Sequence, residues 1–354
     1  MYSYLTGGGM CDMLLQNINF NGDFMKQKIL VLISTLCFML FVGCATSIPV
    51  NIQRPAVLDL GGAESICVVP FKLQEYDDGV KLGGITINFG TIFANTKEQE
   101  AEVEIANFLT NELTSKLAVS DYYKLVNSSV VESAIKAGTK VPVDIYLTGK
   151  IDKFSEDIVR ERKEYFDEND ESYYVTKYSK VVYLVVTYQV VDSKDNSVIS
   201  YKTESYTRTS DLYDDRDDLP KSITVIDQEL NYLVGQIYRN IHPYTEVKYL
   251  QLKSDKSKNP EFEVAEKLAK NGMIKEAQEK FSSIYEQTQN YEAGYNAALL
   301  MQANGDLDNA YNFMKEISEK TADKQSVTAL KDIQFEIDSA KKLQAQNSAR
   351  NSIK

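Results

Sequence analysis

Two clusters of acidic residues carry side chains that could bind a divalent cation. They are Asp167-Glu168-Asn169-Asp170-Glu171 and the group Asp211, Asp214, Asp215, Asp217 and Asp218. Carboxylate oxygens are the ligands that Ca²⁺ prefers, but neither cluster has the D-x-[DN]-x-[DN]-G-x5-E spacing that wraps a loop around this ion. We therefore expect two solvated loops and no metal site.

The chain has one histidine, His242, directly before Pro243. A histidine base needs a nucleophile and a group that orients its ring, and the sequence shows neither beside it. We expect His242 to interact with the C-terminal end of a helix, where the helix dipole favours a cation.

Asp144 and Asp152 are an even number of residues apart in an expected strand, so they would share one face and could act as an acid–base pair. In a chain with 51 Asp and Glu residues, such pairs arise by chance. No G-x-S-x-G, G-x-G-x-x-G, G-x-x-x-x-G-K-[ST] or C-x-x-C motif occurs. We expect a protein that is not an enzyme, has no catalytic residue and binds no cofactor.

Tyrosine is unusually frequent, at 23 residues. Eight of them crowd into one stretch: Tyr165, Tyr173, Tyr174, Tyr178, Tyr183, Tyr188, Tyr201 and Tyr206. Tyrosine suits both the faces of β-sheets and protein interfaces. The sequence leaves both roles open.

The segment Met25–Cys44 has the layout of a secretion signal. Lys26 and Lys28 precede an uncharged apolar run, Ile29–Val42, that would be about 21 Å long as a helix and too short for a bilayer core of about 30 Å. The segment resembles a bacterial lipoprotein signal peptide at residues 25–43, after which Cys44 becomes the lipidated first residue, carrying palmitate or a similar acyl chain. An uncleaved anchor and a buried hairpin are the alternatives.

This interpretation also changes the cysteine count. We expect residues 1–24 to be an artefact or to be removed, and Cys11 and Cys37 to leave with the N-terminus. Only Cys67 then remains, in the apolar run Ile66–Val69, where it should be a small core residue without a disulfide. The net charge of −12 counts against nucleic-acid binding and leaves membrane attachment to the acyl chains of Cys44.

We expect an irregular tether over residues 44–60 and an α/β (α+β) domain over 61–252. The order of apolar runs and helical periodicities predicts a mixed sheet with flanking helices. The expected strands are 65–71, 122–126, 143–154, 181–191 and 197–209, the expected helices begin near 96, 129 and 220, and residues 72–95 form an inserted hairpin or loop.

The α/β region resembles the domain of the curli secretion channel lipoprotein family. The stretches that carry this resemblance are Glu64–Phe71, Leu109–Asn127, Val143–Phe154 with its Leu147-Thr148-Gly149-Lys150, and Pro243–Leu252. Similar domains occur in envelope lipoproteins that activate peptidoglycan synthases. The resemblance implies an envelope lipoprotein and leaves homo-oligomerisation open.

Residues 253–258 (KSDKSK) form a linker, and residues 259–345 repeat with a period of 33. Matched small and apolar positions are Ala265 with Ala298, Gly272 with Gly305, Ala277 with Ala310, and Phe281 with Met314. The pattern resembles tetratricopeptide (TPR) helix-turn-helix repeats, in which small residues let helices approach. A capping helix over 326–343 and a disordered tail over 346–354 would complete this all-α region.

The sequence favours a non-enzymatic scaffold, lipid-anchored through Cys44 on the periplasmic side of a membrane, the outer membrane being favoured. Its helical repeats and α/β domain would bind one or more envelope proteins. A curli-type secretion pore is one alternative, although Arg160–Glu164 do not suit a membrane strand. A cell-wall hydrolase is another alternative, although no site for it is recognisable.

Overall fold

The computed structural model describes residues 46–73, 79–82, 85–88 and 96–351; the signal segment and Cys44 lie outside these ranges. The chain divides into two compact units, Met1–Val50 with Tyr249–Ile333 (the helical unit) and Asn51–Lys248 with Gln334–Lys354 (the α/β unit). The division falls inside three elements: β1 (Thr46–Arg54), β9 (Tyr244–Leu252) and α12 (Lys324–Asn351).

Residues 46–54 are not an irregular tether. They form β1, which pairs with β9 in a two-stranded sheet. Local sequence could not reveal this strand because its partner lies about 190 residues further along the chain. Regular alternation of side-chain burial in β1, with Ile48 and Arg54 buried, fits a strand covered on one face.

A five-stranded mixed sheet forms the centre of the α/β unit, as the sequence predicts. Its strand order is β5 (Lys124–Leu125), β2 (Ser65–Val68), β6 (Ile145–Phe166), β7 (Ser172–Asp192) and β8 (Val198–Thr209). β2 runs parallel to β5 and β6, whereas β6, β7 and β8 are antiparallel. The continuous apolar run of β2 is buried on both faces, and Cys67 lies in the core as expected.

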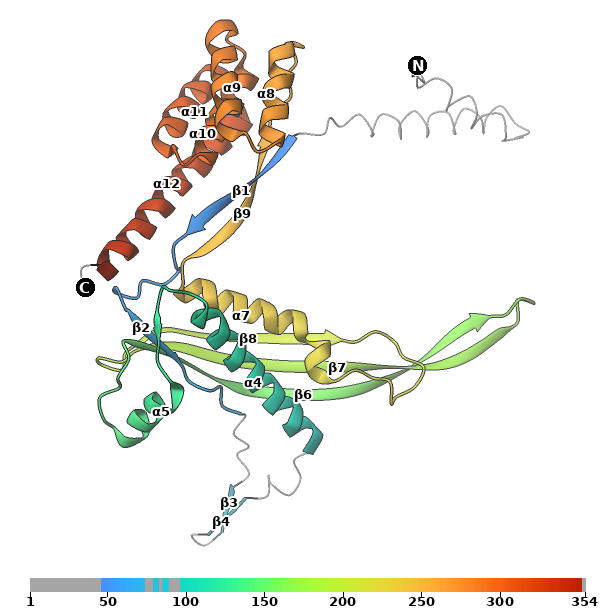
Figure 1. Ribbon diagram of the computed structural model, residues 1–354. Helices are drawn as coiled ribbons and strands as arrows, with labels where there is room; N and C mark the ends of the chain where they lie inside the picture. The colour runs from blue at the N-terminus through green and yellow to red at the C-terminus, as the bar shows by residue number, and fades with distance from the viewer. Residues whose placement is uncertain (1–45, 74–78, 83–84, 89–95, 352–354) are drawn as a thin grey trace. The chain divides into compact units, whose positions relative to one another are not determined.

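Helices cover both faces of this sheet (Figure 1). On one face, α4 (Thr96–Ala118), α6 (Ser222–Val225) and α7 (Asp227–Ile241) pack against alternate apolar residues of β7. On the other face, α5 (Ser128–Ala137) packs over Cys67. Asn127 caps this helix by accepting a hydrogen bond from the Ser129 amide, and Gly138 ends it in the left-handed conformation at φ 64°.

One glycine in the sheet is fixed by packing. A Cβ atom on Gly149 would lie 2.3 Å from Cε1 of the Phe71 ring. Phe71 is buried in the main core, so the ring can pack over β6 only where the strand lacks a side chain.

β6 and β7 are much longer than the sequence predicts. Their pairing runs without interruption past the expected ends, from Ile145 opposite Asp192 to Phe166 opposite Ser172, apart from one bulge at Asp152. β8 pairs with β7 only from Val181 onward, so β6 and β7 continue as a two-stranded projection beyond β8 and the helices (Figure 1). We call residues Ile158–Lys180 the arm.

A second hairpin lies where the sequence predicts an insertion. β3 (Gly79–Leu82) and β4 (Ile85–Asn88) pair antiparallel as a separate two-stranded sheet.

A buried ion-pair network joins three segments of the α/β unit. Arg54 of β1 donates from Nη2 to Glu336 Oε1 at 3.0 Å and from Nη1 to Glu336 Oε2, and Lys248 Nζ lies 2.9 Å from Glu336 Oε1. Burial alone would raise the pKa of Glu336, but the hydrogen bonds from Arg54 and Lys248 outweigh it and hold this pKa below its usual value.

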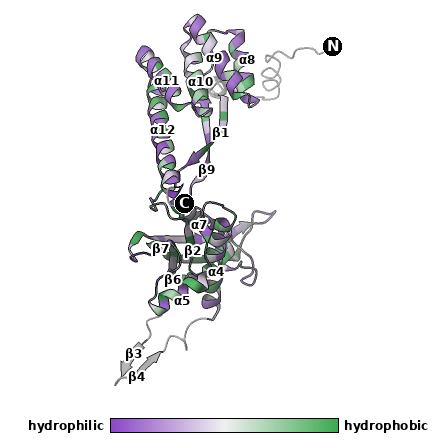
Figure 2. Ribbon diagram, turned by 60° about the vertical axis from the view of Figure 1, so that its left-hand side comes forward, coloured by the Kyte–Doolittle hydropathy of each residue, from purple (hydrophilic) through white to green (hydrophobic). Residues whose placement is uncertain are grey.

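The helical unit contains α8 (Pro260–Lys270), α9 (Ile274–Thr288), α10 (Tyr291–Ala303) and α11 (Leu307–Thr321), followed by the first part of α12. The bounds of α9 and α11 differ by 33 residues, and each helix is 15 residues long. Figure 2 shows that hydrophobic and hydrophilic residues alternate along these helices. Across the described ranges, no helix is long and apolar enough to cross a bilayer.

Residues 346–351 are not a disordered tail. They continue α12, and within the α/β unit the side-chain amide of Gln346 pairs with both the N–H and the carbonyl of Ala56 at 3.0 Å. Glu336, Gln346 and Arg350 of this part of α12 each bind another segment of the α/β unit, at Arg54, Ala56 and Asp121 respectively.

Candidate peptide-binding site

The eight small and apolar positions of the 33-residue pattern lie inside the helical unit. Ala265, Ala277, Phe281, Ala298, Ala310 and Met314 are fully buried on α8 to α11, and Gly272 and Gly305 occupy equivalent turns at φ +79° and +81°. Phe281 packs edge-on against Phe262 at 4.9 Å between ring centroids. These residues hold the helices together and are not themselves accessible to a partner.

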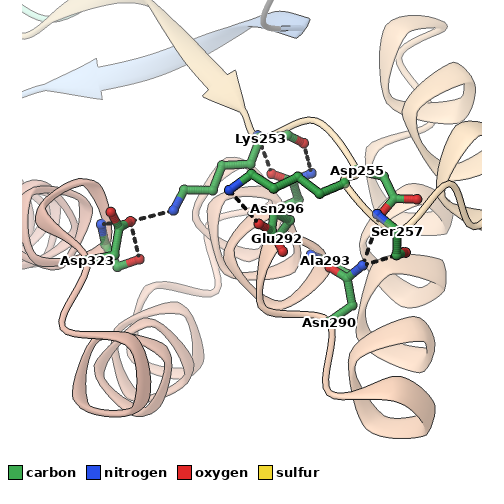
Figure 3. Close-up of polar contacts among 10 residues, drawn as sticks. Lys253, Asp255, Ser257, Asn290, Glu292, Ala293, Asn296 and Asp323 are labelled. Atoms are coloured by element: carbon green, nitrogen blue, oxygen red, sulfur yellow. Dashed lines mark hydrogen bonds and ion pairs between the residues drawn. The ribbon is translucent and has the colours of Figure 1, made fainter.

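The most distinctive polar residue of the helical unit is Asn296, in the middle of α10. It is fully buried, within the run Ala293–Leu300 whose members are all buried. Its Oδ1 accepts a hydrogen bond from the Lys253 amide at 2.7 Å, and its Nδ2 donates to the Lys253 carbonyl at 2.8 Å (Figure 3). A single side chain thus satisfies both main-chain groups of one residue in an extended segment.

The side chain of Lys253 is also held. Its Nζ forms an ion pair with Asp323 (Figure 3). The same Nζ lies 4.6 Å from the centre of the Tyr295 ring. The hydrogen bond from Lys253 lowers the pKa of Asp323 to about 2, so this carboxylate is charged at neutral pH.

A second anchor lies at the start of α10. Asn290 Oδ1 caps the helix by accepting from the Ala293 amide at 2.9 Å, and its Nδ2 donates to Asp255 Oδ1 at 3.1 Å and Ser257 Oγ at 3.3 Å. Figure 3 shows these contacts following one another along the helix. We call Lys253–Ser257 the cis segment, because the chain itself supplies the peptide that lies on α10.

Gln302, six residues after Asn296, offers the same chemistry without a bound peptide group. The residue is 6% exposed, and neither Oε1 nor Nε2 has a hydrogen-bond partner within the part of the chain that the structure describes. Leaving a buried amide unpaired costs free energy, so such groups are rare. α10 therefore carries a second amide, which is buried, unpaired within the described residues and about 120° around the helix from Asn296.

From the sequence, residues 253–258 are expected to be only a linker, and neither Asn290 nor Asn296 is singled out. The segment has no helix or strand, yet its main chain is fixed by α10. A signal was present, since Asn296 interrupts the otherwise small and apolar run Ala293–Leu300, and a buried amide needs a partner.

His242 lies at the end of α7, as expected, but a serine that sequence could not identify is next to it. Ser120 Oγ is hydrogen-bonded to Nε2 of the ring, and Nδ1 faces the carbonyl of Pro243. Burial, opposed in part by the bond to Pro243, lowers the pKa of His242, so the ring is neutral and its Nε2 can accept a hydrogen bond from the Ser120 hydroxyl.

This serine–histidine pair has little space around it. The rings of Tyr122, Tyr123 and Tyr238 lie 4.5–6.1 Å from the His242 ring, and the residue is 8% exposed. The cavity beside Tyr122 and Tyr123 measures about 20 Å³, enough for a single water molecule. The pair fastens the turn after α4 to the end of α7.

Asp144, Asp152 and the two acidic clusters do not come together in one site. Asp144 precedes β6 and accepts from the Ser65 amide at 2.9 Å, whereas Asp152 sits at the bulge and bonds to Thr187 of β7. The bulge breaks the alternation that would place both aspartates on one face. The acidic residues of both clusters are exposed, and Asp214 forms an ion pair with Lys177. No cluster of metal-ligating residues occurs in the described ranges.

Comparisons with known proteins yield only distant likenesses. No protein-family model matches the chain, and no curated protein does. Among solved structures, it is similar to the PelC dodecamer of Paraburkholderia phytofirmans, with 11% identity over 55% of this chain and 98% of that one and a TM-score of 0.25. It is also similar to lipoprotein GNA1162 of Neisseria meningitidis (14% identity, 49% and 97% coverage, TM-score 0.20) and to a minor lipoprotein of Acinetobacter baumannii (11%, 51% and 85%, 0.17). Likenesses this distant carry no argument about function.

Proposed function

We propose that this protein is a non-enzymatic scaffold of the bacterial cell envelope, anchored by a lipid on Cys44, whose helical repeats bind extended peptide segments of partner proteins. The repeats are of the TPR kind, and α10 supplies the binding face. The anchor holds the scaffold on the periplasmic side of a membrane, with the outer membrane favoured.

The observation that carries the proposal is the pairing of Asn296 with the main chain of Lys253. Because both bonds go to backbone atoms, the contact does not depend on the side chain of the bound residue. A partner segment of different sequence can make the same two bonds. Asp323 and Tyr295 add a preference for a cation at that position.

A partner that binds along α10 displaces the cis segment from Asn296, so binding of the partner and release of the cis segment are coupled.

Support for the anchor comes from the sequence alone. Lys26, Lys28 and the 14-residue apolar run before Cys44 fit a lipoprotein signal, and the acidic net charge disfavours electrostatic binding to anionic lipids. Replacing Cys44 by serine should abolish acylation and move the protein out of the membrane fraction, whereas replacing Cys37 should leave fractionation unchanged.

The peptide-binding role is tested by photo-cross-linking in cells. A photoreactive residue replaces Val264, which is exposed on α8, and in a control it replaces Val130, which is exposed on α5 of the α/β unit. We expect the Val264 position to capture an envelope protein. The purified partner, added to the full chain, should then accelerate trypsin cleavage within residues 253–258.

Two results would contradict the proposal. A partner that binds without changing cleavage in residues 253–258 does not use the α10 face. A partner captured equally from Val130 and Val264 shows no preference for the helical unit.

A further inference from the structure

The arm exposes an unusual concentration of aromatic rings. Near its tip Phe166 is 65% exposed, Tyr174 52%, Tyr173 49% and Tyr165 40%. Consecutive strand residues point to opposite faces, so Tyr165 and Tyr173 lie on one face of the arm, and Phe166 and Tyr174 lie on the other face with Arg162. Each face therefore exposes on the order of 200 Å² of aromatic ring. Exposed apolar patches rimmed by polar residues are typical of interaction surfaces.

The outer edges of the arm also lack a partner strand in the described part of the chain. From Ile158 to Phe166, and from Ser172 to Lys177, the two strands pair only with each other within the described residues. A two-stranded ribbon is marginally stable in water, and its free edges can pair with another strand. The rings and the edges together indicate that a partner covers the arm.

The charges of the arm indicate what that partner is. The tip carries Asp167, Glu168, Asp170 and Glu171, and none of them forms an ion pair in the described part of the chain. Arg160 and Arg162 on the shaft likewise have no carboxylate partner there, although Arg162 lies 4.2 Å from the centre of the Tyr174 ring.

These opposite charges cannot neutralise each other within one molecule. Arg162 and Asp167 are five residues apart, which is about 17 Å along a strand. That distance exceeds the screening length of about 8 Å at physiological salt. An antiparallel second arm would bring each acidic tip onto the arginines of the other copy.

We propose that the arm is a self-association surface on which the arm of a second copy lies antiparallel. The acidic tip of each copy then contacts Arg160 and Arg162 of the other, and the tip aromatics of both copies pack at the centre. On the face that carries Arg160 and Arg162, the rings of Phe166 and Tyr174 from two copies contribute on the order of 400 Å², less than the roughly 1,200 Å² of a standard interface. The association is therefore weak and salt-dependent.

Charge reversal tests this arrangement in the full chain, held in uncharged detergent micelles. One variant reverses the shaft (R160E/R162E), and another reverses the tip (E168K/E171K). Glu168 and Glu171 are chosen for the tip because their carboxylates take no part in the turn, which the Asp167 side chain holds by accepting from two backbone amides. Sedimentation velocity up to about 100 μM covers the micromolar range of a weak interface.

We expect the wild-type protein to associate with rising concentration and to dissociate at high salt. Each variant alone should associate at least about tenfold more weakly, because tip and shaft then carry the same sign. An equimolar mixture of the two variants should associate again, since the acidic shaft of one meets the basic tip of the other.

A matched control changes the net charge by the same amount as R160E/R162E, but at positions outside the arm. Lys140 and Lys202 are exposed and in no ion pair among the described residues, so K140E/K202E should associate as the wild type does. Circular dichroism verifies that each variant is folded. A monomeric wild type, a shaft or tip variant that associates normally, or a mixture that stays dissociated would each overturn the proposal.

Discussion

Removing the side chain of Asn296 should release the cis segment. In Asn296→Ala, the N–H and the carbonyl of Lys253 both lose their partner, and alanine cannot replace either bond. Water reaches these groups only if the segment leaves the helix. The substitution therefore shifts the local equilibrium between the bound and the open segment.

The size of this shift follows from the two bonds. Leaving a buried polar group unpaired costs about 1–3 kcal/mol, and part of that cost is recovered when the segment opens and is hydrated. We take about 2 kcal/mol as the net loss for the pair. Since about 1.4 kcal/mol is a factor of ten, the open population should rise about 30-fold.

Trypsin provides the assay because Lys253, Lys256 and Lys258 lie in or beside the cis segment. Cleavage of a transiently open segment follows its open population when closing is faster than cleavage. Mass spectrometry of the fragments should show cleavage at these three lysines about 30-fold faster than in the wild type. Cleavage at Lys275, in α9, reports unfolding of the whole helical unit and should change far less.

Asn309→Ala is the matched control. Asn309 is exposed, and its Nδ2 bonds only to the neighbouring Asp306 at 2.9 Å, so cleavage in residues 253–258 should stay at the wild-type rate. The reasoning fails if Asn296→Ala changes that cleavage less than about threefold. It also fails if cleavage at Lys275 rises by the same factor, because the effect is then global.

Three further predictions concern the α/β unit and are measured by urea denaturation. Glu336→Gln leaves the buried Arg54 with only the half-exposed Glu246 as a charge partner and should lower the free energy of unfolding by up to about 3 kcal/mol. Because the pKa of Glu336 is depressed, its stabilisation is complete above pH ~4.3 and is lost as pH falls through the folded value; the variant should lack this acid-dependent loss. Gly149→Ala forces the Phe71 ring to move and should cost about 1–3 kcal/mol, and an unchanged midpoint would contradict that packing. Gly235→Ala, in α7 with no atom within 4 Å of the new Cβ, should instead stabilise by up to about 1 kcal/mol, and a loss of stability would argue against free space there.

Apolar periodicity was sufficient to predict the central sheet and its helices. The run Ile66–Val68 is completely buried, so it is apolar throughout and is recognisable as a strand. The helices of the 33-residue pattern pack against helices close to them in sequence, so their apolar residues recur at helical spacing. The arm was missed because it is exposed on both faces, so its strands do not alternate between apolar and polar residues. Charged residues such as Arg160–Glu164 therefore gave no indication of a strand.

The contacts of the candidate site could not be predicted from the sequence, for a different reason. Asn296 could have been singled out as a polar residue in an apolar helix, but its partner at Lys253 is fixed only when the chain folds back on α10. The pairing of Ser120 with His242 likewise joins residues 122 positions apart. Lipidation of Cys44 remains a prediction, since it lies outside the described ranges.

Cys67 has a consequence for chemical labelling of the protein. Its thiol is fully buried, and burial, with a smaller contribution from Glu132, raises its pKa to about 11. The sulfur therefore stays protonated and out of reach of oxidising enzymes and thiol reagents, since the thiolate is the reactive form. A cysteine introduced on the surface of the α/β unit would react with a maleimide label while Cys67 does not, which makes the folded domain suitable for site-specific fluorophores.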